Sequence, residues 1–205
     1  SAFIGEDMQQ LFDALLSHSA TGAHEKQRLN TGLNFVADIG KDFSDRNRTS
    51  PFAFTGNKFE FRMVGSSATL STPNVVLNAA VSEMLSRMSD RLEKADKSRL
   101  HEEALGLACE FYERHKRIVF NGNGYSKEWF EEAEKRGLVH IDNSITAYDA
   151  LLAPKNVALF EKFKIMNKKE LESRRAIYLD NYEKTALIEA RTMLMMAKRE
   201  ILPAC

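Results

Sequence analysis

Hydrophobic residues recur at two spacings along the chain, and each spacing predicts a different backbone conformation. Near the N-terminus, five apolar residues at helical spacing follow the acidic pair Glu6 and Asp7, which predicts a short amphipathic helix. These five residues are Met8, Leu11, Phe12, Leu15 and Leu16. From His18 to Asp45 the pattern gives way to polar residues and glycines, so we expect a long loop there.

Helical spacing returns after residue 74 and continues towards the C-terminus. Two long helices are predicted over residues 74–94 and 100–120, and the sequence NGNGY at residues 121–125 marks a break. After this break, Ser126 is placed to cap a short helix, which Gly137 is placed to end.

The last third of the chain is predicted to be helical as well. Ser144 and Pro154 begin further short helices. Asn167 and Glu170 form a capping-box pattern at the start of a final helix that extends to about Ile201, roughly 50 Å at about 1.5 Å per residue. The second half of this helix is apolar over much of its circumference, which predicts that it packs against partners on several sides.

Residues 46–62 have the sequence RNRTSPFAFTGNKFEFR. Phenylalanines alternate with other residues in this segment, as is typical of β-strands. Thr55-Gly56-Asn57 is typical of a tight turn, so we predict a hairpin with Gly56 and Asn57 at its centre. This register places phenylalanines opposite one another on one side of the hairpin. The two predicted pairs are Phe54 with Phe59 and Phe52 with Phe61.

The other side of the hairpin is charged, because a period of two places Lys58, Glu60 and Arg62 together. Two interpretations are open. These side chains can form a solvated strand face whose ion pairs contribute only about 0–1 kcal/mol. Alternatively, a carboxylate between two cations suits a site where a metal-bound phosphate meets an anionic substrate, since Mg²⁺ prefers oxygen ligands and arginine binds oxyanions.

Together these elements predict an α+β fold that is predominantly helical. One β-hairpin packs on helices, and a helical C-terminal region with a long final helix follows. The charged stretch from Glu93 to Arg99 is the one plausible boundary, so we expect two domains, residues 1–97 and residues 98–205. Because hairpins are marginal by themselves, we expect a helix to cover the phenylalanines.

Composition narrows the function classes. Lysine plus arginine equals aspartate plus glutamate at 29 each, which argues against a general nucleic-acid or membrane-surface binder. No run of about eighteen apolar residues is present, so we expect no transmembrane helix. Cys109 and Cys205 lie far apart without a secretory segment, which favours free thiols and a cytoplasmic location. The chain starts without an initiator methionine, and we take it to be a piece of a longer protein.

Long strings of residues resemble a known family. The segment DRNRTSPFAFTGNKFEFRM, continued by GSSATLSTPNVVLN, resembles the substrate-site segment of type III glutamine synthetases. The string IEARTMLMMAKREILPA resembles the final helix of the same family. The resemblance covers the whole chain and is weakest in residues 18–45 and 121–143. It identifies the chain as similar to a C-terminal fragment of such an enzyme.

The resemblance implies an ATP-dependent glutamate–ammonia ligase of nitrogen assimilation. In that family ATP phosphorylates the glutamate side chain, and ammonia then displaces phosphate to give glutamine. The resemblance implies that Arg48 and Lys58 bind ATP phosphates and that Glu60 binds Mg²⁺ or Mn²⁺. It also implies that Arg62 is the catalytic residue that holds the glutamate carboxylate or the phosphate.

One implied position conflicts with strict strand alternation. If the strand continued back to Arg48, that residue would lie on the phenylalanine side of the hairpin, opposite Glu60. We therefore expect the strand pattern to break between Arg48 and Phe52, with Pro51 the favoured place.

The resemblance also implies partners and a limit. Family members are large ring-shaped homo-oligomers that use glutamate, ammonia and ATP, and neither a nucleic acid nor a membrane is an expected partner. Their other metal ligands have no counterpart in these 205 residues, so we expect the chain alone to be inactive. The alternative function is a non-catalytic helical assembly module in residues 98–205.

Overall fold

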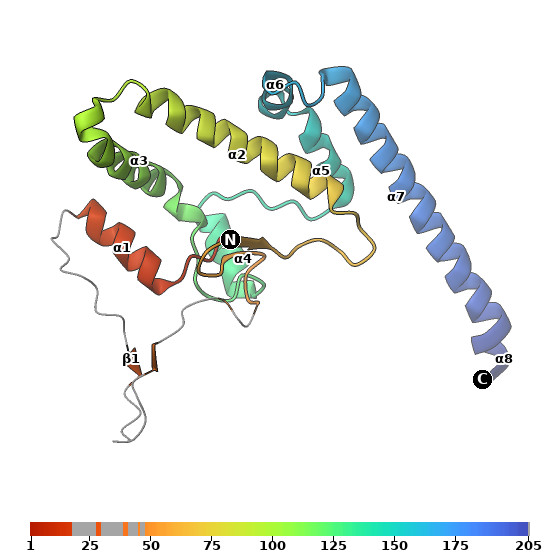
Figure 1. Cartoon of the computed structure of the whole chain (residues 1–205). Helices are drawn as coiled ribbons and strands as arrows, with labels where there is room; N and C mark the ends of the chain where they lie inside the picture. Colours follow the sequence, from red (N-terminus) through yellow and green to blue (C-terminus); the bar gives the residue numbers. More distant parts are fainter. Residues whose placement is uncertain (18–27, 30–38, 41–44, 46–47, 205) are drawn as a thin grey trace. The chain divides into compact units, whose positions relative to one another are not determined.

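The computed structural model describes residues 1–17, 28–29, 39–40, 45 and 48–204, and most of these residues are helical (Figure 1). They form two compact units. The first unit combines Ser1–Asn74 with Met84–Val139, and the second combines Val75–Glu83 with His140–Cys205. The predominantly helical α+β class is confirmed. The predicted domain boundary after residue 97 stays a prediction.

The predicted helices before the NGNGY break are present. Their bounds are Glu6–Leu16 for α1, Ser71–Leu92 for α2, Lys97–Arg99 for the 3-10 turn η1, Leu100–His115 for α3 and Lys116–Ile118 for the 3-10 turn η2. The regular part of α3 ends earlier than residue 120, because the chain tightens into η2. Helix α1 packs on α3 through the stacked rings of Phe12 and Tyr112, whose centroids lie 4.6 Å apart.

Helix α4 follows the break and spans Lys127–Lys135. As predicted, the Ser126 hydroxyl caps it by accepting a hydrogen bond from the Trp129 amide at 3.4 Å. Gly137, with φ of 66°, follows its C-terminus in the left-handed conformation that glycine adopts readily. The buried Trp129 ring stacks on Phe120, with ring centroids 4.5 Å apart.

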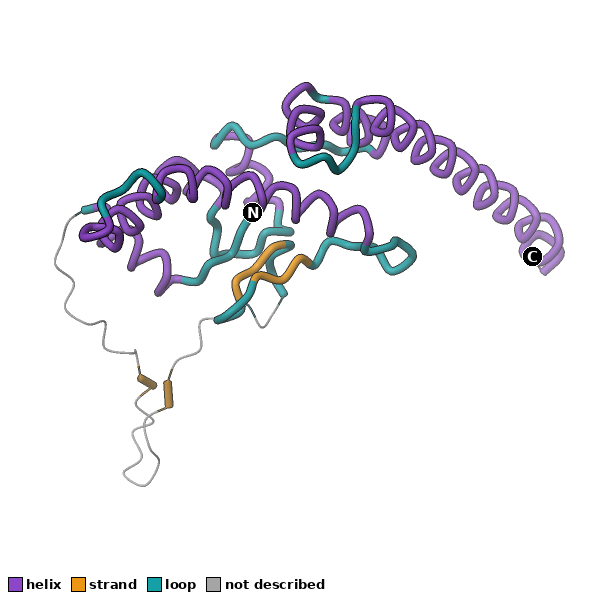
Figure 2. Tube along the Cα trace, turned by 45° about the horizontal axis from the view of Figure 1, so that its top comes forward, coloured by secondary structure: helices purple, strands orange, loops and turns teal. Residues whose placement is uncertain are grey.

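Strands β3 (Phe52–Phe54) and β4 (Phe59–Phe61) form the predicted antiparallel hairpin, drawn in orange in Figure 2. The predicted register is confirmed, since Phe52 is opposite Phe61 and Phe54 is opposite Phe59. The Thr55 amide donates to the Lys58 carbonyl at 2.8 Å, which closes a two-residue turn. Gly56 has φ of 96° in that turn, a conformation that residues with a Cβ rarely adopt.

The N-terminal residues attach this hairpin to the end of α3. Phe3 donates to the Phe52 carbonyl at 2.9 Å and accepts from the Phe54 amide at 2.8 Å. On its other side, Ala2 donates to the Ile118 carbonyl at 2.9 Å and accepts from the Phe120 amide at 3.0 Å. Residues 2–3 therefore bridge β3 and the segment that leads into the NGNGY loop.

The two sides of the hairpin differ in exposure. Ala53 is fully buried on the side of Glu60, whereas Phe59 and Phe61 on the other side are 50% and 39% exposed. The described residues of the first unit therefore leave part of the phenylalanine side uncovered.

The predicted long loop from His18 to Asp45 falls mostly outside the described residues. The parts that are described include strands β1 (Arg28–Leu29) and β2 (Ile39–Gly40), which pair antiparallel. For these four residues the loop prediction is wrong, because Arg28 pairs with Gly40 and Leu29 with Ile39 in a short antiparallel sheet.

The second unit contains the remaining helices. Their bounds are Ser144–Asp149 for α5, Ala150–Leu152 for the 3-10 turn η3, Pro154–Lys162 for α6, Lys168–Met196 for α7, Ala197–Ile201 for the π-helical turn η4 and Leu202–Ala204 for α8. The capping box before α7 is confirmed: Asn167 Oδ1 accepts from the Glu170 amide at 3.0 Å, and Glu170 Oε2 accepts from the Asn167 amide at 2.7 Å. The predicted final helix reaches Ile201, but its last five residues are π-helical. None of the described helices combines the length and the apolar character that a membrane span requires.

Candidate functional site

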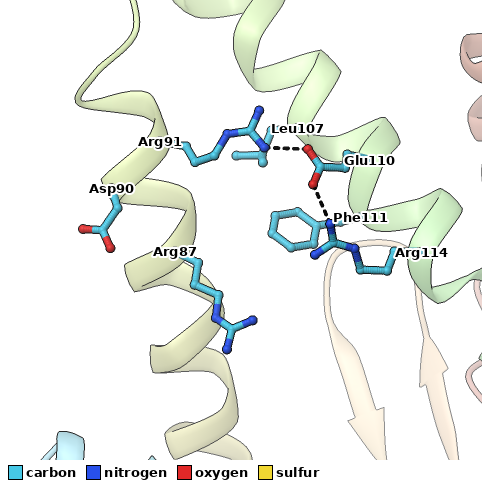
Figure 3. Close-up of a pocket in the computed structure, with 7 residues that line it drawn as sticks. All are labelled: Arg87, Asp90, Arg91, Leu107, Glu110, Phe111 and Arg114. Carbon is cyan, nitrogen blue, oxygen red and sulfur yellow. Dashed lines mark hydrogen bonds and ion pairs between the residues drawn. The ribbon is translucent and has the colours of Figure 1, made fainter.

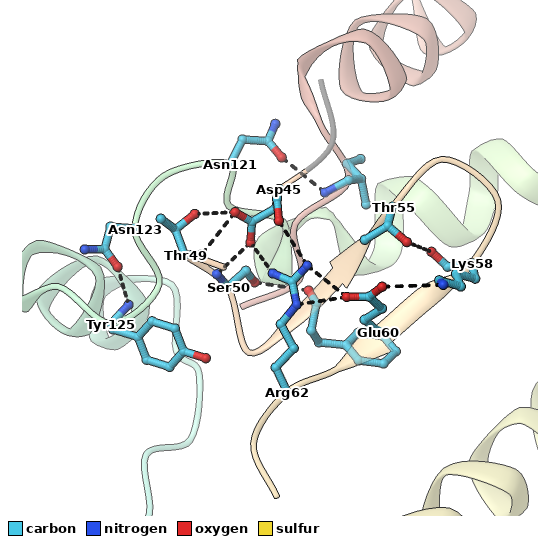
Figure 4. A network of polar contacts seen from close by, with 12 residues as sticks. Asp45, Thr49, Ser50, Thr55, Lys58, Glu60, Arg62, Asn121, Asn123 and Tyr125 are labelled. Atoms are coloured by element: carbon cyan, nitrogen blue, oxygen red, sulfur yellow. Dashed lines mark hydrogen bonds and ion pairs between the residues drawn. The ribbon is translucent and has the colours of Figure 1, made fainter. Parts of the chain in front are cut away.

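The charged side of the hairpin is a continuous row of ion pairs. Lys58 Nζ lies 3.6 Å from Glu60 Oε1, and Arg62 Nη2 lies 3.1 Å from Glu60 Oε2 (Figure 4). Arg62 Nε also donates to Glu60 Oε2 at 3.2 Å. The grouping of Lys58, Glu60 and Arg62 that the strand period predicts is therefore confirmed.

Arg48 joins these residues from outside the hairpin. Strand β3 begins only at Phe52, and Arg48 itself has φ of 55°, in the left-handed region. The strand pattern therefore breaks before Phe52, as expected. Pro51 lies inside the break, and its carbonyl accepts from the Arg62 amide at 2.8 Å.

A pocket of about 450 Å³ brings the four predicted site residues together. Its lining comprises Asp45, Arg48, Thr55, Asn57, Lys58, Glu60 and Arg62. Three of these side chains are cationic and two are anionic, so the lining has a net charge of +1. An adjoining pocket of about 350 Å³ is lined by Arg48, Glu60, Arg62 and Tyr125. The site is thus a polar recess suited to an anionic ligand.

Asp45 is a further residue of the site. The sequence marked it only as the end of a predicted loop and indicated no functional role for it. Its side chain is buried and accepts four hydrogen bonds. Oδ1 accepts from the amide and the hydroxyl of Thr49, at 3.0 and 2.8 Å. Oδ2 accepts from the Ser50 amide at 2.9 Å and from Arg62 Nη1 at 2.7 Å. No local sequence pattern marks this residue, because its charged partner lies seventeen residues away.

The NGNGY loop also belongs to the site. The Gly124 amide donates to the Thr49 carbonyl at 2.7 Å, and Asn121 Oδ1 accepts from the amides of Ile4 and Gly5 at 3.2 and 3.0 Å. These contacts hold the loop against the strand break and place Tyr125 at the adjoining pocket (Figure 4). The sequence indicated a break here, but nothing in it indicated the tertiary contact.

Both carboxylates of the pocket have lowered pKa values. Hydrogen bonds from Arg62 contribute most to the lowered pKa of Glu60, and the charges of Arg62 and Lys58 add to the effect. For Asp45, burial acts to raise the pKa, but the hydrogen bonds from Thr49 and Ser50 and the charge of Arg62 together outweigh it. Both side chains are therefore ionised at neutral pH.

The donor set fits a share of a divalent-metal site. Asp45 is already saturated by donors on both oxygens, so Glu60 is the pocket carboxylate that can turn towards a cation. Among the described residues, its Oε1 has only the 3.6 Å contact with Lys58. Mg²⁺ prefers six oxygen ligands, and no group of three or more acidic, histidine or cysteine side chains occurs among the described residues. Glu60 can thus provide one ligand, with the others supplied from outside this part of the chain.

A third pocket, of about 270 Å³, lies between α2 and α3 (Figure 3). There Glu110 accepts from Arg91 at 2.5 Å and from Arg114 at 2.8 Å. Arg91 and Arg114 are 53% and 58% exposed at their side chains. This arrangement is a surface ion-pair cluster that links two helices, and it provides matched controls for the site.

Comparisons with known proteins all point to glutamine synthetases. A family model described as the glutamine synthetase C-terminal domain matches residues 105–205. A type-3 glutamine synthetase of Dictyostelium discoideum is 35% identical over 206 residues, which cover 100% of this chain. Glutamine synthetases of Bacteroides fragilis (strain YCH46) and Butyrivibrio fibrisolvens are 34% and 33% identical, over 99% and 98% of this chain. The chain spans 28% of the length of each of these three relatives. The chain therefore belongs to the glutamine synthetase family, and residues 105–205 correspond to its C-terminal domain.

Proposed function

We propose that this chain supplies one wall of the active site of an ATP-dependent glutamate–ammonia ligase. The observation that carries the proposal is the single pocket lined by Arg48, Lys58, Glu60 and Arg62. The family resemblance implied ligand-binding roles for these four residues, and a purely solvated strand face would not require Arg48 to turn towards the other three. The net positive lining suits ATP phosphates and the carboxylates of glutamate.

In the proposed reaction an oxygen of the glutamate side-chain carboxylate attacks the γ-phosphorus of ATP, and ADP leaves. Ammonia then attacks the acyl carbon, and the C–O bond to phosphate breaks to release phosphate and glutamine. In this proposal Arg48 and Lys58 bind ATP phosphates, and Arg62 holds the carboxylate or the transferred phosphate. Catalysis of phosphoryl transfer rests mainly on positioning and charge neutralisation, which these cations provide.

Glu60 is the proposed metal ligand of this wall. A bound Mg²⁺ or Mn²⁺ supplies charge neutralisation between phosphate oxygens. Glu60 alone cannot complete the coordination of such an ion, which requires about six oxygen ligands for Mg²⁺. We therefore expect the 205-residue chain by itself to form no glutamine from glutamate, ammonia and ATP.

The test uses a full-length glutamine synthetase subunit that carries these 205 residues as its C-terminal part. Glu60→Gln keeps the shape of the side chain but removes its charge, so glutamine formation should fall by about a hundredfold or more. Glu110→Gln is the matched control, because Glu110 also accepts from two arginines but lies outside the pocket. Glutamine formation by Glu60→Gln equal to that of Glu110→Gln would refute the proposed role.

Exposed apolar side chains on the last helices favour a second function, homo-oligomer assembly. They include Leu187, Ile188, Met193, Leu194, Met195, Met196, Ile201 and Leu202, each at least 43% exposed. An apolar surface of this kind is typical of a protein interface. In this candidate role the helical region packs subunits of a cytoplasmic ring, and both functions can reside in one chain.

The two functions can be distinguished by substitutions at different places, because a change on α7 should affect assembly and a change in the pocket should affect glutamine formation. In the full-length subunit, Ile188→Asp should reduce the mass of the assembly measured by sedimentation velocity. Thr185→Asp adds the same charge one turn away on α7 without removing an apolar side chain, and should leave the mass unchanged. Glu60→Gln should leave the assembly intact while glutamine formation falls. Intact rings with Ile188→Asp would argue against the assembly role.

A further inference from the structure

The Arg62 guanidinium is held from two sides by partners of different character. On one side the carboxylate and the carbonyl of Asp45 accept from Nη1 at 2.7 Å and from Nη2 at 3.0 Å. On the other side Glu60 Oε2 accepts from Nε at 3.2 Å and from Nη2 at 3.1 Å. Asp45 therefore holds the Nη1/Nη2 edge of the guanidinium, and Glu60 holds the neighbouring Nε/Nη2 edge through one carboxylate oxygen.

The two partners differ in how free they are to move. The side chain of Asp45 is 2% exposed and is fixed by three further hydrogen bonds from Thr49 and Ser50. The side chain of Glu60 is 39% exposed, and its other contact among the described residues is the 3.6 Å ion pair with Lys58. Asp45 is thus the permanent partner of Arg62, and Glu60 is the exchangeable one.

Five N–H donors belong to a guanidinium, and the contacts with Asp45 and Glu60 use four of them. If Glu60 turns towards a cation, Nε and one Nη2 hydrogen become available along a single edge. That edge has the two parallel donors that a carboxylate or a phosphate accepts. This edge faces the pocket only if the adjacent Nη1/Nη2 edge stays on Asp45.

We propose that Asp45 is a positioning residue, which holds the Nη1/Nη2 edge of Arg62 so that the neighbouring Nε/Nη2 edge is presented to an oxyanion of the substrate. The inference rests on the proposed function of Arg62 and adds a residue to it. Asp45 touches neither substrate nor metal, since its two carboxylate oxygens already accept four hydrogen bonds. It acts through the direction that it gives to Arg62.

The first readout is steady-state kinetics of the full-length subunit that carries this chain. Asp45→Asn keeps the size of the side chain and weakens its grip on Arg62. It should lower kcat/KM for glutamate by about tenfold or more, through KM and kcat together, because misdirected groups lose much of their effect on the transition state. The KM for ATP should stay within about twofold.

Asp96→Asn is the matched control. Asp96 also accepts from an amide and a hydroxyl, both of Ser98 and both at 2.9 Å, but the described part of the chain gives it no arginine partner. Its kcat/KM for glutamate should stay within about twofold of the unsubstituted enzyme. If Asp45→Asn impairs folding, Thr49→Val provides a milder variant, which removes only the hydroxyl that donates to Asp45. Thr49→Val should lower kcat/KM for glutamate by a smaller factor than Asp45→Asn does.

The second readout is independent of activity. In the 205-residue chain, nitrogen NMR of the arginine side chains should show Arg62 with hindered rotation of its Nη groups. Arg62→Lys assigns the signal by removing it. The hindered signal should be lost in Asp45→Asn and should persist in Asp96→Asn and in Glu60→Gln.

The outcomes distinguish this inference from the proposed function. An inactive Arg62→Ala enzyme together with an Asp45→Asn enzyme of unchanged kcat/KM and an unchanged Arg62 signal would overturn the role of Asp45 alone. An active Arg62→Ala enzyme would overturn both proposals, because Asp45 would then position a residue that the reaction does not need. Loss of the Arg62 signal in Asp45→Asn, with the selective loss of kcat/KM for glutamate, supports the inference.

Discussion

Arg62 Nη1 lies 2.7 Å from Asp45 Oδ2, and this contact joins the residue that follows the hairpin to a buried carboxylate before it. The side chains of Arg62 and Asp45 are 13% and 2% exposed. Removing one partner of a buried pair leaves the other charge uncompensated, which makes such pairs sensitive to substitution and to pH. Arg62 and Asp45 therefore both stabilise the pocket wall and contribute to its charge.

The stability of the chain should depend on the charge of Asp45. Its folded pKa is lowered from 3.8, so its contribution to stability is present above that unfolded value and is lost as the pH falls through the folded pKa. The difference in free energy of unfolding between the unsubstituted chain and Asp45→Asn should therefore stay constant from pH 7 down to about 4 and shrink as the pH falls below 3.8. Denaturant unfolding at several pH values measures it. Asp90→Asn, which removes an exposed carboxylate, is the control.

Gly124 and Gly106 should respond to alanine in opposite directions. A Cβ at Gly124 would clash with Ser1 Oγ and would lie 3.3 Å from Pro51 Cδ and from the Thr49 carbonyl oxygen, so the packing of the loop on these residues must shift. We expect Gly124→Ala to destabilise the chain by about 1–3 kcal/mol. A Cβ at Gly106, inside α3, meets nothing within 4 Å, so Gly106→Ala should stabilise by about 0.5–1 kcal/mol. Thermal unfolding of both variants compares them, and equal shifts would contradict the packing of the loop.

Tyr112 should titrate late. Burial and the hydrogen bond that its hydroxyl donates to Asp13, at 3.1 Å, raise its pKa to about 12. Because the folded pKa exceeds the unfolded value of 10.0, this stabilisation is present below pH 10.0 and is lost as the pH rises through about 12. Tyrosinate absorbance should contain a late component that Tyr112→Phe removes. Removal of that component by Tyr125→Phe instead, at a tyrosine that is 50% exposed, would contradict the assignment.

Local chemistry made much of the fold predictable. The alternation of residues 52–61 determined the hairpin register, since a shift by one residue would move every phenylalanine to the charged side. The capping box at Asn167 and Glu170 likewise needs only neighbouring residues. Such features depend on short sequence separations, and the structure confirms them.

The remaining parts of the site depend on contacts between distant residues. Asp45 and Arg62 are seventeen residues apart, and the contact of Gly124 with Thr49 joins the NGNGY loop to the strand break. No periodic pattern relates such positions, so the sequence marked them only as a loop end and a helix break. The break that turns Arg48 into the pocket was predicted, but only because the family resemblance conflicted with strand alternation.

The central claim is that the pocket formed by the hairpin binds the reacting groups, and glutamine formation by Arg62→Ala in the full-length subunit tests it most directly. We expect a loss of about a hundredfold or more relative to the unsubstituted enzyme. Arg91→Ala is the matched control, since Arg91 is also paired with a glutamate but lies outside this pocket, and should change activity by about twofold at most. Activity of Arg62→Ala equal to that of Arg91→Ala, in an assembled enzyme, would contradict the account.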